Sequence, residues 1–360
     1  MTVGWGVVGC GRLAGVTIPD GIFAAPNAEL VGVTDVVVER ARETADRFHT
    51  RAFPGIDELL SEPSIDAVYV ATPHASHAEL TIAAARRGKH VLCEKPLALN
   101  AEQAHEMVRA CEEAGVTLGH GTMMRFNSCH QTMRELLVRG EIGRPVAVHA
   151  RYGDWWAPEV PGASADDETI WRMDRDRGVA WRQSRRLSGG GAMMDMGVHV
   201  IDTAVFLLGH VKEVAAFCDT LTSSADVEDT ASVLLKFQSG VQATLESYTS
   251  VSNVPGRRRF QVFGESGSLL AEETMGPPSA RNRLFHLDGS VDRKTEPEPR
   301  EVECPPVNMY ETQFRLFSEA VETGSKYANP GEEGLHVQRV LDAVYRSSGE
   351  RRFISIGVEE

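Results

Sequence analysis

The chain has 360 residues, of which 42% are hydrophobic and 24% are charged, and these values are typical of a soluble protein with two domains. The formal net charge of −14 argues against a nucleic-acid or anionic-membrane partner, because such partners bind clustered Lys and Arg. No apolar run approaches the roughly 20 residues of a membrane span, and no signal peptide or C-x-x-C pair is apparent. We therefore expect a cytoplasmic protein with reduced cysteines.

The first third of the chain alternates short Val-rich runs with helical patterns. Uninterrupted apolar runs of this length are typical of strands covered by helices on both faces. The alternation predicts an α/β fold with a doubly wound parallel sheet. The expected strands are Gly4–Gly9, Glu29–Asp35, Ile65–Ala71, Lys89–Cys93 and Val116–Gly121, and the expected helices include Glu39–Phe48, Ala75–Arg87 and Ala101–Ala114.

From about Arg144 the pattern changes to alternating strands, which predict antiparallel pairing. These strands are expected at Val146–Tyr152, Val211–Asp219, Thr230–Phe237, Gly240–Tyr248, Arg258–Phe263 and Gly267–Ala271, with a helix from about Gly191 and terminal helices at Asn308–Thr323 and Glu332–Ser348. We place the domain boundary at residue 125, so that residues 1–125 form the first domain and residues 126–360 the second.

A glycine-rich turn, Gly9-Cys10-Gly11-Arg12-Leu13-Ala14, follows the first strand and opens a helical pattern. Its first glycine permits a tight turn, and its second lets the backbone approach a pyrophosphate that a helix N-terminus binds. This context predicts a dinucleotide site that Gly9, Gly11, Arg12 and Leu13 contact.

Asp35 ends the second strand, where a carboxylate can accept hydrogen bonds from the ribose hydroxyls of adenosine. The following residues are Val36, Val37 and Val38, so a ribose 2′-phosphate would meet a negative charge without an adjacent counter-ion. The sequence therefore favours NAD over NADP.

Lys95 stands in Glu94-Lys95-Pro96 just past a strand end, which is where open α/β sheets bind ligands. Pro96 restricts the preceding residue to extended backbone and so fixes where the ammonium points. A lysine there can hydrogen-bond a substrate oxygen and stabilise alkoxide character in a transition state. An isolated Lys-Pro pair would more simply be a surface lysine beside a turn.

Asp195 and His199 are four residues apart on the helix expected near Gly191, and Asp202 continues the same face. His199 can take a hydroxyl proton while Asp195 orients the ring or stabilises its cation, and Asp202 could equally be a structural partner. Two such ligands are too few for a metal ion, so no metal site is expected. His74 and His77 are interpreted as loop residues near the cofactor.

Together these motifs resemble the glucose–fructose oxidoreductase/inositol dehydrogenase/MocA family over essentially the whole chain. The residues that carry the resemblance are Gly9-Cys10-Gly11, Ala71-Thr72-Pro73-His74, Glu94-Lys95-Pro96, Met124-Arg125-Phe126-Asn127 and Gly189-Gly190-Gly191 with Asp195 and His199. The resemblance implies an N-terminal Rossmann domain, on which the terminal helices can pack back. It also implies a C-terminal α/β domain with a large, open, mainly antiparallel sheet that forms homodimers or homotetramers.

The resemblance also assigns roles. Lys95 matches the catalytic lysine, His199 the acid/base and Asp195 its partner. The further residues that it places near the nicotinamide, the rest of the cofactor or the substrate are Thr72, Pro73, His74, Glu94, Arg125, Trp181 and Arg182. The chemistry that it implies is NAD-dependent interconversion of a secondary hydroxyl and a ketone on a cyclic sugar, inositol or related polyol.

The stretch from Gly153 to Ser188 holds four of the five tryptophans and six arginines. One interpretation is a lid, in which an indole such as that of Trp155 stacks on a sugar next to Tyr152 and arginines bind polar groups. The alternative is a domain or subunit interface, with the arginines paired to Asp166, Asp167, Asp174 and Asp176. We weigh the two equally.

Two rival functions remain. One is a glycoside hydrolase or lyase that oxidises the sugar transiently, returns the hydride and releases no net NADH. The other is a non-catalytic cofactor-binding regulator, since a fold alone does not prove chemistry. The intact set of Lys95, Asp195 and His199 argues against the regulator.

Overall fold

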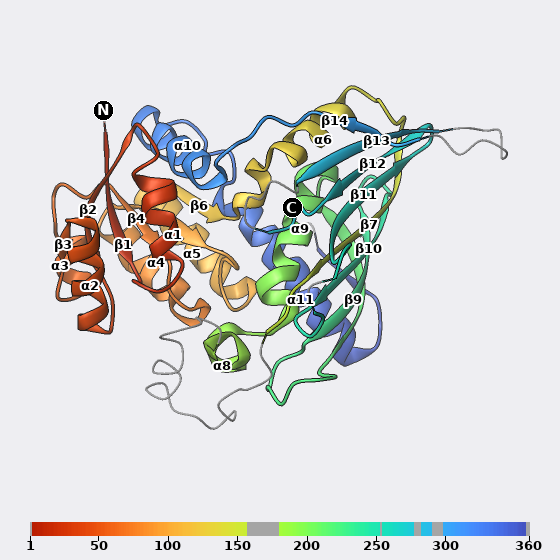
Figure 1. Cartoon of the computed structure of the whole chain (residues 1–360). Coiled ribbons are helices and arrows are strands. Elements are labelled where there is room, and N and C mark those ends of the chain that lie inside the picture. The colour runs from red at the N-terminus through yellow and green to blue at the C-terminus, as the bar shows by residue number, and fades with distance from the viewer. Residues whose placement is uncertain (1, 157–179, 253, 277–281, 290–297, 358–360) are drawn as a thin grey trace. The chain divides into compact units, whose positions relative to one another are not determined.

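The structure is a computed structural model that describes residues 2–156, 180–252, 254–276, 282–289 and 298–357. The chain divides into two compact units, each assembled from three separate segments (Figure 1). Unit 1 comprises Met1–Met123, Ser164–Gly189 and Asn308–Gln338. Unit 2 comprises Met124–Ala163, Gly190–Val307 and Arg339–Glu360.

Unit 1 is built on a six-stranded sheet in which every strand pair is parallel, with the order β3-β2-β1-β4-β5-β6. The strands are β1 (Val3–Val8), β2 (Ala28–Thr34), β3 (Arg51–Ala52), β4 (Ala67–Val70), β5 (His90–Glu94) and β6 (Leu118–Gly121). The strand order reverses between β1 and β4, and in open α/β sheets this is where ligands bind beyond the carboxyl ends of the strands. The prediction of a doubly wound parallel sheet is confirmed.

Helices connect these strands, and the best-capped one is α5, where the Asn100 side chain accepts a hydrogen bond from the Gln103 N–H and Gly115 ends the helix with φ of 65°. The helical elements of unit 1 are α1 (Ala14–Thr17), the π-helical turn η1 (Ile18–Ile22), α2 (Val38–Phe48), α3 (Ile56–Leu60), the 3₁₀ turn η2 (His74–Ser76), α4 (His77–Arg86), α5 (Ala101–Ala114), the 3₁₀ turn η4 (Ala180–Gln183), α8 (Arg185–Ser188) and α10 (Met309–Thr323). Helix α11 (Gly331–Glu350) begins in unit 1 and ends in unit 2.

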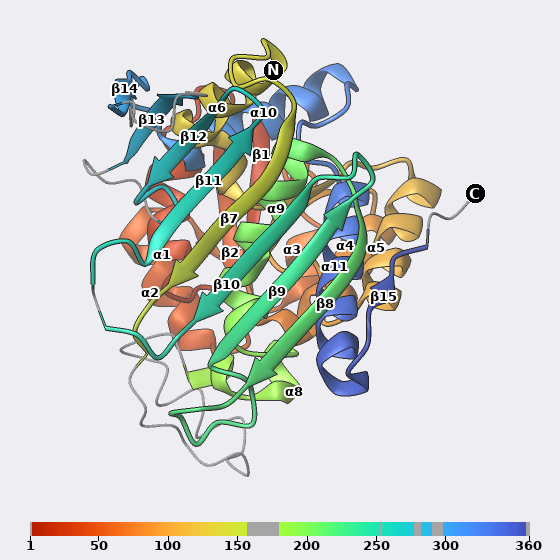
Figure 2. The ribbon, with the colours of Figure 1, turned by 90° about the vertical axis from the view of Figure 1, so that its right-hand side faces the viewer.

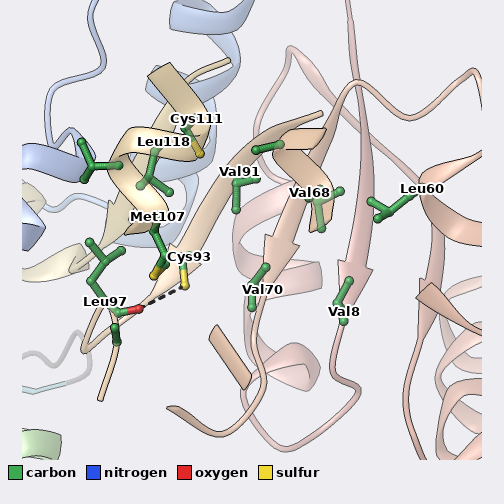
Figure 3. Packing of buried hydrophobic residues seen from close by; sticks show 14 of the residues in the cluster. Val8, Leu60, Val68, Val70, Val91, Cys93, Leu97, Met107, Cys111 and Leu118 are labelled. Atoms are coloured by element: carbon green, nitrogen blue, oxygen red, sulfur yellow. Dashed lines mark hydrogen bonds between the residues drawn. The ribbon is translucent and has the colours of Figure 1, made fainter. Parts of the chain in front are cut away.

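The core of unit 1 lies between the sheet and its helices. Figure 3 shows Val8 of β1, Val68 of β4 and Val91 of β5 along the sheet, and Met107 of α5 next to Cys93 of β5; all are buried. Burying each such side chain contributes about 1.5–3 kcal/mol relative to its exposure.

The C-terminal helix α10 completes that core on β1. Trp5 is fully buried, its ring lies 4.9 Å from that of Phe314 and 5.3 Å from that of Phe317, and its Nε1–H donates to Ser318 Oγ over 3.1 Å. Residues more than 300 positions apart in the chain therefore share one apolar cluster in unit 1.

Unit 2 contains a nine-stranded sheet with the order β14-β13-β12-β11-β7-β10-β9-β8-β15. Its strands are β7 (Pro145–Gly153), β8 (Val211–Asp219), β9 (Thr230–Phe237), β10 (Gln242–Tyr248), β11 (Arg258–Gly264), β12 (Gly267–Glu272), β13 (Arg283–Asp288), β14 (Arg300–Val302) and β15 (Ile354–Ser355). The mainly antiparallel sheet is confirmed, with one correction. The central pair β7 and β10 is parallel, because β7 returns to the sheet through helices rather than through a hairpin.

The two faces of this sheet differ. Along β9, Ala231, Val233, Leu235 and Phe237 are buried, whereas Leu234 between them is 52% exposed. The inner face packs on helical elements of unit 2, which are α6 (Ser128–Val138), the π-helical turn η5 (Met193–Gly197) and α9 (Val198–Leu208), and the 3₁₀ turn η3 (Met123–Phe126) precedes α6. Figure 2 looks onto the other face, which no helix among the described residues of unit 2 covers.

Within the described residues, Arg185–Leu208 is the one segment with the length and apolarity of a membrane-spanning helix. In this protein 78% of its most apolar window is buried in the interior, as in the core helix of a globular fold.

Candidate active site

The glycine-rich turn of unit 1 leaves room for a ligand at one glycine and not at the other. Gly9 has φ of 98°, and a Cβ there would lie 2.6 Å from the carbonyl oxygen of Ala71, so both conformation and space require glycine. At Gly11 a Cβ would meet no heavy atom within 4 Å. The backbone at Gly11 is therefore open to a close approach, as a pyrophosphate requires.

Asp35 holds this turn from the end of β2. Its Oδ2 accepts a hydrogen bond from the Cys10 N–H over 2.7 Å, and its Oδ1 accepts one from the Val37 N–H over 2.8 Å. Burial, and next the charge of Asp35, raises the pKa of the Cys10 thiol to about 12, so this thiol stays protonated at neutral pH. The strained Gly9, the open Gly11 and the carboxylate of Asp35 together fit a dinucleotide cofactor.

His77 ties two backbone segments of unit 1 together. Its Nε2 lies 2.9 Å from the carbonyl oxygen of Thr72, and its Nδ1 lies 2.9 Å from that of Pro96. Burial lowers the pKa of His77, and these backbone hydrogen bonds oppose that shift. The interpretation of His74 and His77 as loop residues is wrong. His74 begins η2, His77 begins α4, and both are buried, because their side chains bond the backbone on which these helical turns pack.

The residues next to Lys95 form a buried hydrogen-bonded group at the carboxyl end of β5. The Tyr69 hydroxyl donates to Glu94 Oε1 over 2.6 Å, and the Lys95 N–H donates to Glu94 Oε2 over 3.2 Å. Burial raises the pKa of Glu94, while the hydrogen bond from Tyr69 and the charges of Lys95 and Arg182 oppose the rise. Lys95 itself is half-buried, and its peptide bond to Pro96 is cis.

Residues 180–189 pack on the segment that follows β4. Trp181 is buried, and its ring meets that of His74 edge-on at 4.6 Å, while the Arg182 guanidinium lies 4.4 Å from the Trp181 ring. His74 Nδ1 lies 2.8 Å from the carbonyl oxygen of Ser188. Of the Trp/Arg stretch Gly153–Ser188, to which the lid and interface interpretations apply, residues 157–179 lie outside the described residues.

In unit 2, Asp195 and His199 lie on a helical segment that begins at the glycine run. The segment opens with the π-helical turn η5, in which i→i+5 bonds replace i→i+4 bonds, and continues as α9. The predicted regular α-helix is corrected here in one respect, since the segment opens with this π-helical turn before it continues as α9. The Asp195 N–H donates to the Gly191 carbonyl over 3.0 Å.

Tyr152 lies beside His199 on the inner face of the sheet, with the two ring centroids 6.1 Å apart. Burial raises the pKa of Tyr152 to about 12, the charge of Arg258 opposes the rise, and the charge of Asp195 adds to it. The Tyr152 hydroxyl is therefore protonated at neutral pH and can donate a hydrogen bond. Trp155, further along the same strand direction, is 52% exposed.

Arg125, from η3, forms a buried ion pair in unit 2. Its Nε donates to both carboxylate oxygens of Asp202 over 3.0 Å, and a terminal nitrogen lies 2.9 Å from Oδ1. The two side chains are 5% and 0% exposed. Asp202 thus has the structural role that the sequence analysis left open, and Arg125, expected near substrate or cofactor, connects η3 to α9.

The predicted residues fall into two groups by unit. The group in unit 1 is Gly9, Gly11, Arg12, Leu13, Asp35, Thr72, Pro73, His74, His77, Glu94, Lys95, Trp181 and Arg182. The group in unit 2 is Arg125, Tyr152, Trp155, Asp195 and His199. Among the described residues, no cluster of three or more His, Cys, Asp and Glu side chains has the arrangement that a metal ion needs.

The sequence analysis missed Glu228, which contacts the start of the helical segment that carries Asp195 and His199. A signal was present, since an acidic pair, Glu228-Asp229, immediately precedes the apolar strand β9. Its partner residues are at least 35 positions away, so no local pattern could identify them.

Comparison with known proteins agrees with this architecture. Residues 3–122 match the model of the oxidoreductase family with an NAD-binding Rossmann fold, and residues 130–270 match the GFO/IDH/MocA C-terminal domain. The chain is 32% identical to 1,5-anhydro-D-fructose reductase of Ensifer adhaerens over 335 residues, which cover 92% of each chain. It is 28% identical to myo-inositol 2-dehydrogenase of Thermotoga maritima, with 98% of each chain covered.

Among solved structures, the aldose–aldose oxidoreductase of Caulobacter crescentus superposes with a TM-score of 0.84 and 26% identity, over 99% of this chain and all of that one. The expectations of a CH–OH dehydrogenase or reductase with NAD as cofactor are confirmed. The chain belongs to the GFO/IDH/MocA family of NAD(P)-dependent oxidoreductases.

Proposed function

We propose that the chain interconverts a secondary hydroxyl and a ketone on a cyclic sugar, inositol or related polyol, with NAD as the redox partner. The observation that carries the proposal is Lys95 at the carboxyl end of β5, on the sheet edge where Gly9 and Asp35 form the dinucleotide turn. The names of two relatives, an anhydrofructose reductase and an inositol dehydrogenase, support a polyhydroxylated cyclic substrate.

The residues of unit 1 hold the cofactor and polarise the substrate in this proposal. When bound, the nicotinamide supplies or accepts the hydride. Lys95 donates a hydrogen bond to the substrate oxygen and stabilises the negative charge that develops on it. The residues that we assign to cofactor binding are Gly9, Gly11, Arg12, Leu13, Asp35, Thr72, Pro73, His74, His77, Glu94, Trp181 and Arg182.

The residues of unit 2 handle the proton and the sugar. His199 takes the hydroxyl proton during oxidation and returns it during reduction, and Asp195 orients the imidazole and stabilises its cation. Tyr152 and Trp155 contact the substrate, whereas Arg125 acts through its ion pair with Asp202. Apart from Trp181 and Arg182, we assign cofactor binding to residues 1–125, and we assign substrate binding and oligomerisation to residues 126–360.

The test uses lysines at the two ends of one strand. The purified protein is incubated with NAD⁺ and a panel of inositols, aldoses, anhydrosugars and glycosides while NADH absorbance and released products are followed together. Lys95→Ala should lower kcat by about 100-fold or more, because its contact strengthens in the transition state. The matched control is Lys89→Ala, whose ammonium donates to the carbonyls of Glu62 and Ile65 at the other end of β5.

Three outcomes would change the proposal. Undiminished turnover by the Lys95→Ala variant would remove Lys95 from the mechanism. Full turnover by His199→Gln would do the same for proton transfer, with His105→Gln at an exposed position of α5 as the matched histidine control. Glycoside cleavage without net NADH would move the protein to the hydride-recycling hydrolases or lyases.

We further propose that the open face of the nine-stranded sheet joins copies of this chain into a homodimer or homotetramer in the cytoplasm. Phe217 is 74% exposed and Leu234 is 52% exposed on this face, where His149 and Phe263 also pack ring against ring at 5.3 Å. Burying apolar side chains of this size under a partner lowers the free energy of the assembly. Sedimentation analysis should show dissociation of Leu234→Lys, but not of Val138→Asp on α6.

A further inference from the structure

Glu228 is a buried carboxylate in unit 2 with three hydrogen-bond donors around it. Its Oε2 accepts from the Gly191 N–H over 2.8 Å, and its Oε1 accepts from the Met193 N–H over 2.9 Å and from the Tyr345 hydroxyl over 2.8 Å. Its backbone carbonyl accepts from the Ala192 N–H over 3.0 Å. Only 4% of the residue is exposed. One residue therefore takes three consecutive backbone N–H groups.

Those N–H groups lie at the start of the helical segment that bears Asp195 and His199. The first N–H groups of a helix have no partner within it, and a buried start needs acceptors from elsewhere. A negative charge at this end also interacts favourably with the helix dipole. Glu228 supplies both the acceptors and the negative charge. The last N–H that Glu228 binds is that of Met193, and Asp195 lies two residues further along the helix.

The glycine run makes this contact possible. A Cβ at Gly191 would collide with the carbonyl group of Glu228, so only glycine lets the two backbones approach this closely. A second contact comes from β10, where the Ser247 hydroxyl donates to the Ala192 carbonyl over 2.8 Å. The segment is thus fixed from β9, from β10 and, through Tyr345, from α11.

A carboxylate suits this position better than an amide. Both of its oxygens accept hydrogen bonds, whereas the amide of a glutamine would present N–H donors to one of the two backbone N–H groups. Burial raises the pKa of Glu228, and the hydrogen bonds from Met193, Gly191 and Tyr345 oppose the rise. The cost of burying the charge is therefore offset by the same contacts that fix the helix start.

We propose that Glu228 is the positioning residue for the acid/base pair of this enzyme. By holding the backbone from Gly191 to Met193, it sets where Asp195 and His199 stand, without contacting substrate or cofactor itself. The inference rests on the proposed function in one respect, which is the role of His199 in proton transfer.

The experiment compares Glu228→Gln and Tyr345→Phe with Glu265→Gln, which makes the same substitution at an exposed turn of unit 2. With the substrate that the panel identifies, Glu228→Gln should lower kcat by about 10- to 100-fold, because a displacement of about 1 Å can cost 100-fold. KM and the Kd for NADH, measured by nucleotide fluorescence, should change less than about threefold. Tyr345→Phe keeps the carboxylate and removes one donor, so its loss of kcat should be several-fold smaller.

Hydrogen exchange supplies a readout that does not depend on turnover. In Glu228→Gln the peptide that covers residues 189–200 should take up deuterium at least about tenfold faster, while strands β8 to β10 should keep the exchange of the unmodified chain. A purely structural role would instead accelerate exchange throughout unit 2 and leave kcat per folded molecule unchanged. Unchanged kcat in Glu228→Gln, or unchanged hydrogen exchange at residues 189–200, would overturn the proposal. If Glu228→Gln folds poorly, the same two measurements on Tyr345→Phe test the proposal instead.

The His199→Gln variant in the same assay separates the two ideas. If His199→Gln is inactive and Glu228→Gln keeps full kcat, the positioning role fails and the proposed function stands. If His199→Gln keeps full turnover, the proton-transfer role fails, and the positioning role fails with it.

Discussion

The two units hold their functional residues in different ways. In unit 1 the backbone determines the site, since Gly9 occupies a conformation with φ of 98° and the His77 ring lies between two backbone carbonyls, 2.9 Å from each. In unit 2 charged side chains determine it, since Arg125 pairs with Asp202 inside the protein and Glu228 binds the start of a helix. The stability of unit 1 should therefore fall when atoms are added at its glycines. The stability of unit 2 should fall when its buried charges are removed, and it should depend on pH.

The largest expected effect is the loss of the buried ion pair in unit 2. Arg125→Ala should reduce the free energy of unfolding by about 3–5 kcal/mol, because it leaves the Asp202 carboxylate buried without its cation. Urea denaturation measures this. Arg139→Ala, which breaks an exposed pair with Glu135 on α6, should cost less than about 1 kcal/mol. Equal losses of unfolding free energy in Arg125→Ala and Arg139→Ala would contradict the role of buried charge in unit 2.

The second effect is the pH dependence of stability that His130 introduces into unit 2. Its ring contacts the Met124 carbonyl and the Thr274 hydroxyl, and burial lowers its pKa from 6.5 to about 4. As pH falls, the unfolded chain therefore binds this proton first. The contribution to stability is complete above pH 6.5 and is lost as pH falls towards 4, which amounts to about 3 kcal/mol.

Urea titrations at several pH values test this expectation. His130→Gln should flatten the dependence of the unfolding free energy between pH 6.5 and 4, whereas His105→Gln, at an exposed position of α5, should keep the slope. If both variants keep the slope, other groups cause the pH dependence.

The third effect concerns added atoms in unit 1. Gly9→Ala should destabilise the protein by about 1–3 kcal/mol, because the residue must keep a positive φ with a Cβ against Ala71. Gly11→Ala should leave the melting temperature unchanged, because its Cβ has open space, but it should weaken NADH binding. Thermal melts with and without NADH separate the two effects. A normal Kd for NADH in Gly11→Ala would show that no phosphate approaches this glycine.

The smallest effect is on cofactor choice. Asp35→Asn keeps one acceptor for the Cys10 or Val37 N–H and removes the charge beside the ribose. Its Kd for NADH should rise by about tenfold, the equivalent of one hydrogen bond to a charged group, and its preference over NADPH should shrink. Fluorescence titration with both nucleotides measures the ratio. Tighter binding of NADPH than NADH by the unmodified chain would contradict the NAD assignment.

The same contrast explains how much the sequence could predict. The part of unit 1 within residues 1–123 carries local signals, so its Val-rich strands, the caps at Asn100 and Gly115 and the glycine-rich turn were predictable from short windows. Strand β3, with two residues, and the helical turn α3, with five, are too short to show a periodic pattern.

Unit 2 depends on partners that are distant in sequence. The parallel pairing of β7 with β10 joins residues about 95 positions apart, and the Arg125–Asp202 pair spans 77 positions. The π-helical turn at Met193–Gly197 also departs from the periodicity that a helix pattern assumes. Such features follow from tertiary packing, which no window of the sequence contains.

The packing of Trp5 against α10 has a consequence for synthesis of the chain. Trp5 of β1 is made long before Ser318, which accepts the hydrogen bond of its indole and follows 313 residues later in the chain. At about 5–20 residues per second, that interval lasts roughly 15–60 seconds. Unit 1 therefore cannot complete its core while residues 1–123 are translated, and the apolar surface of Trp5 stays uncovered until α10 has been made.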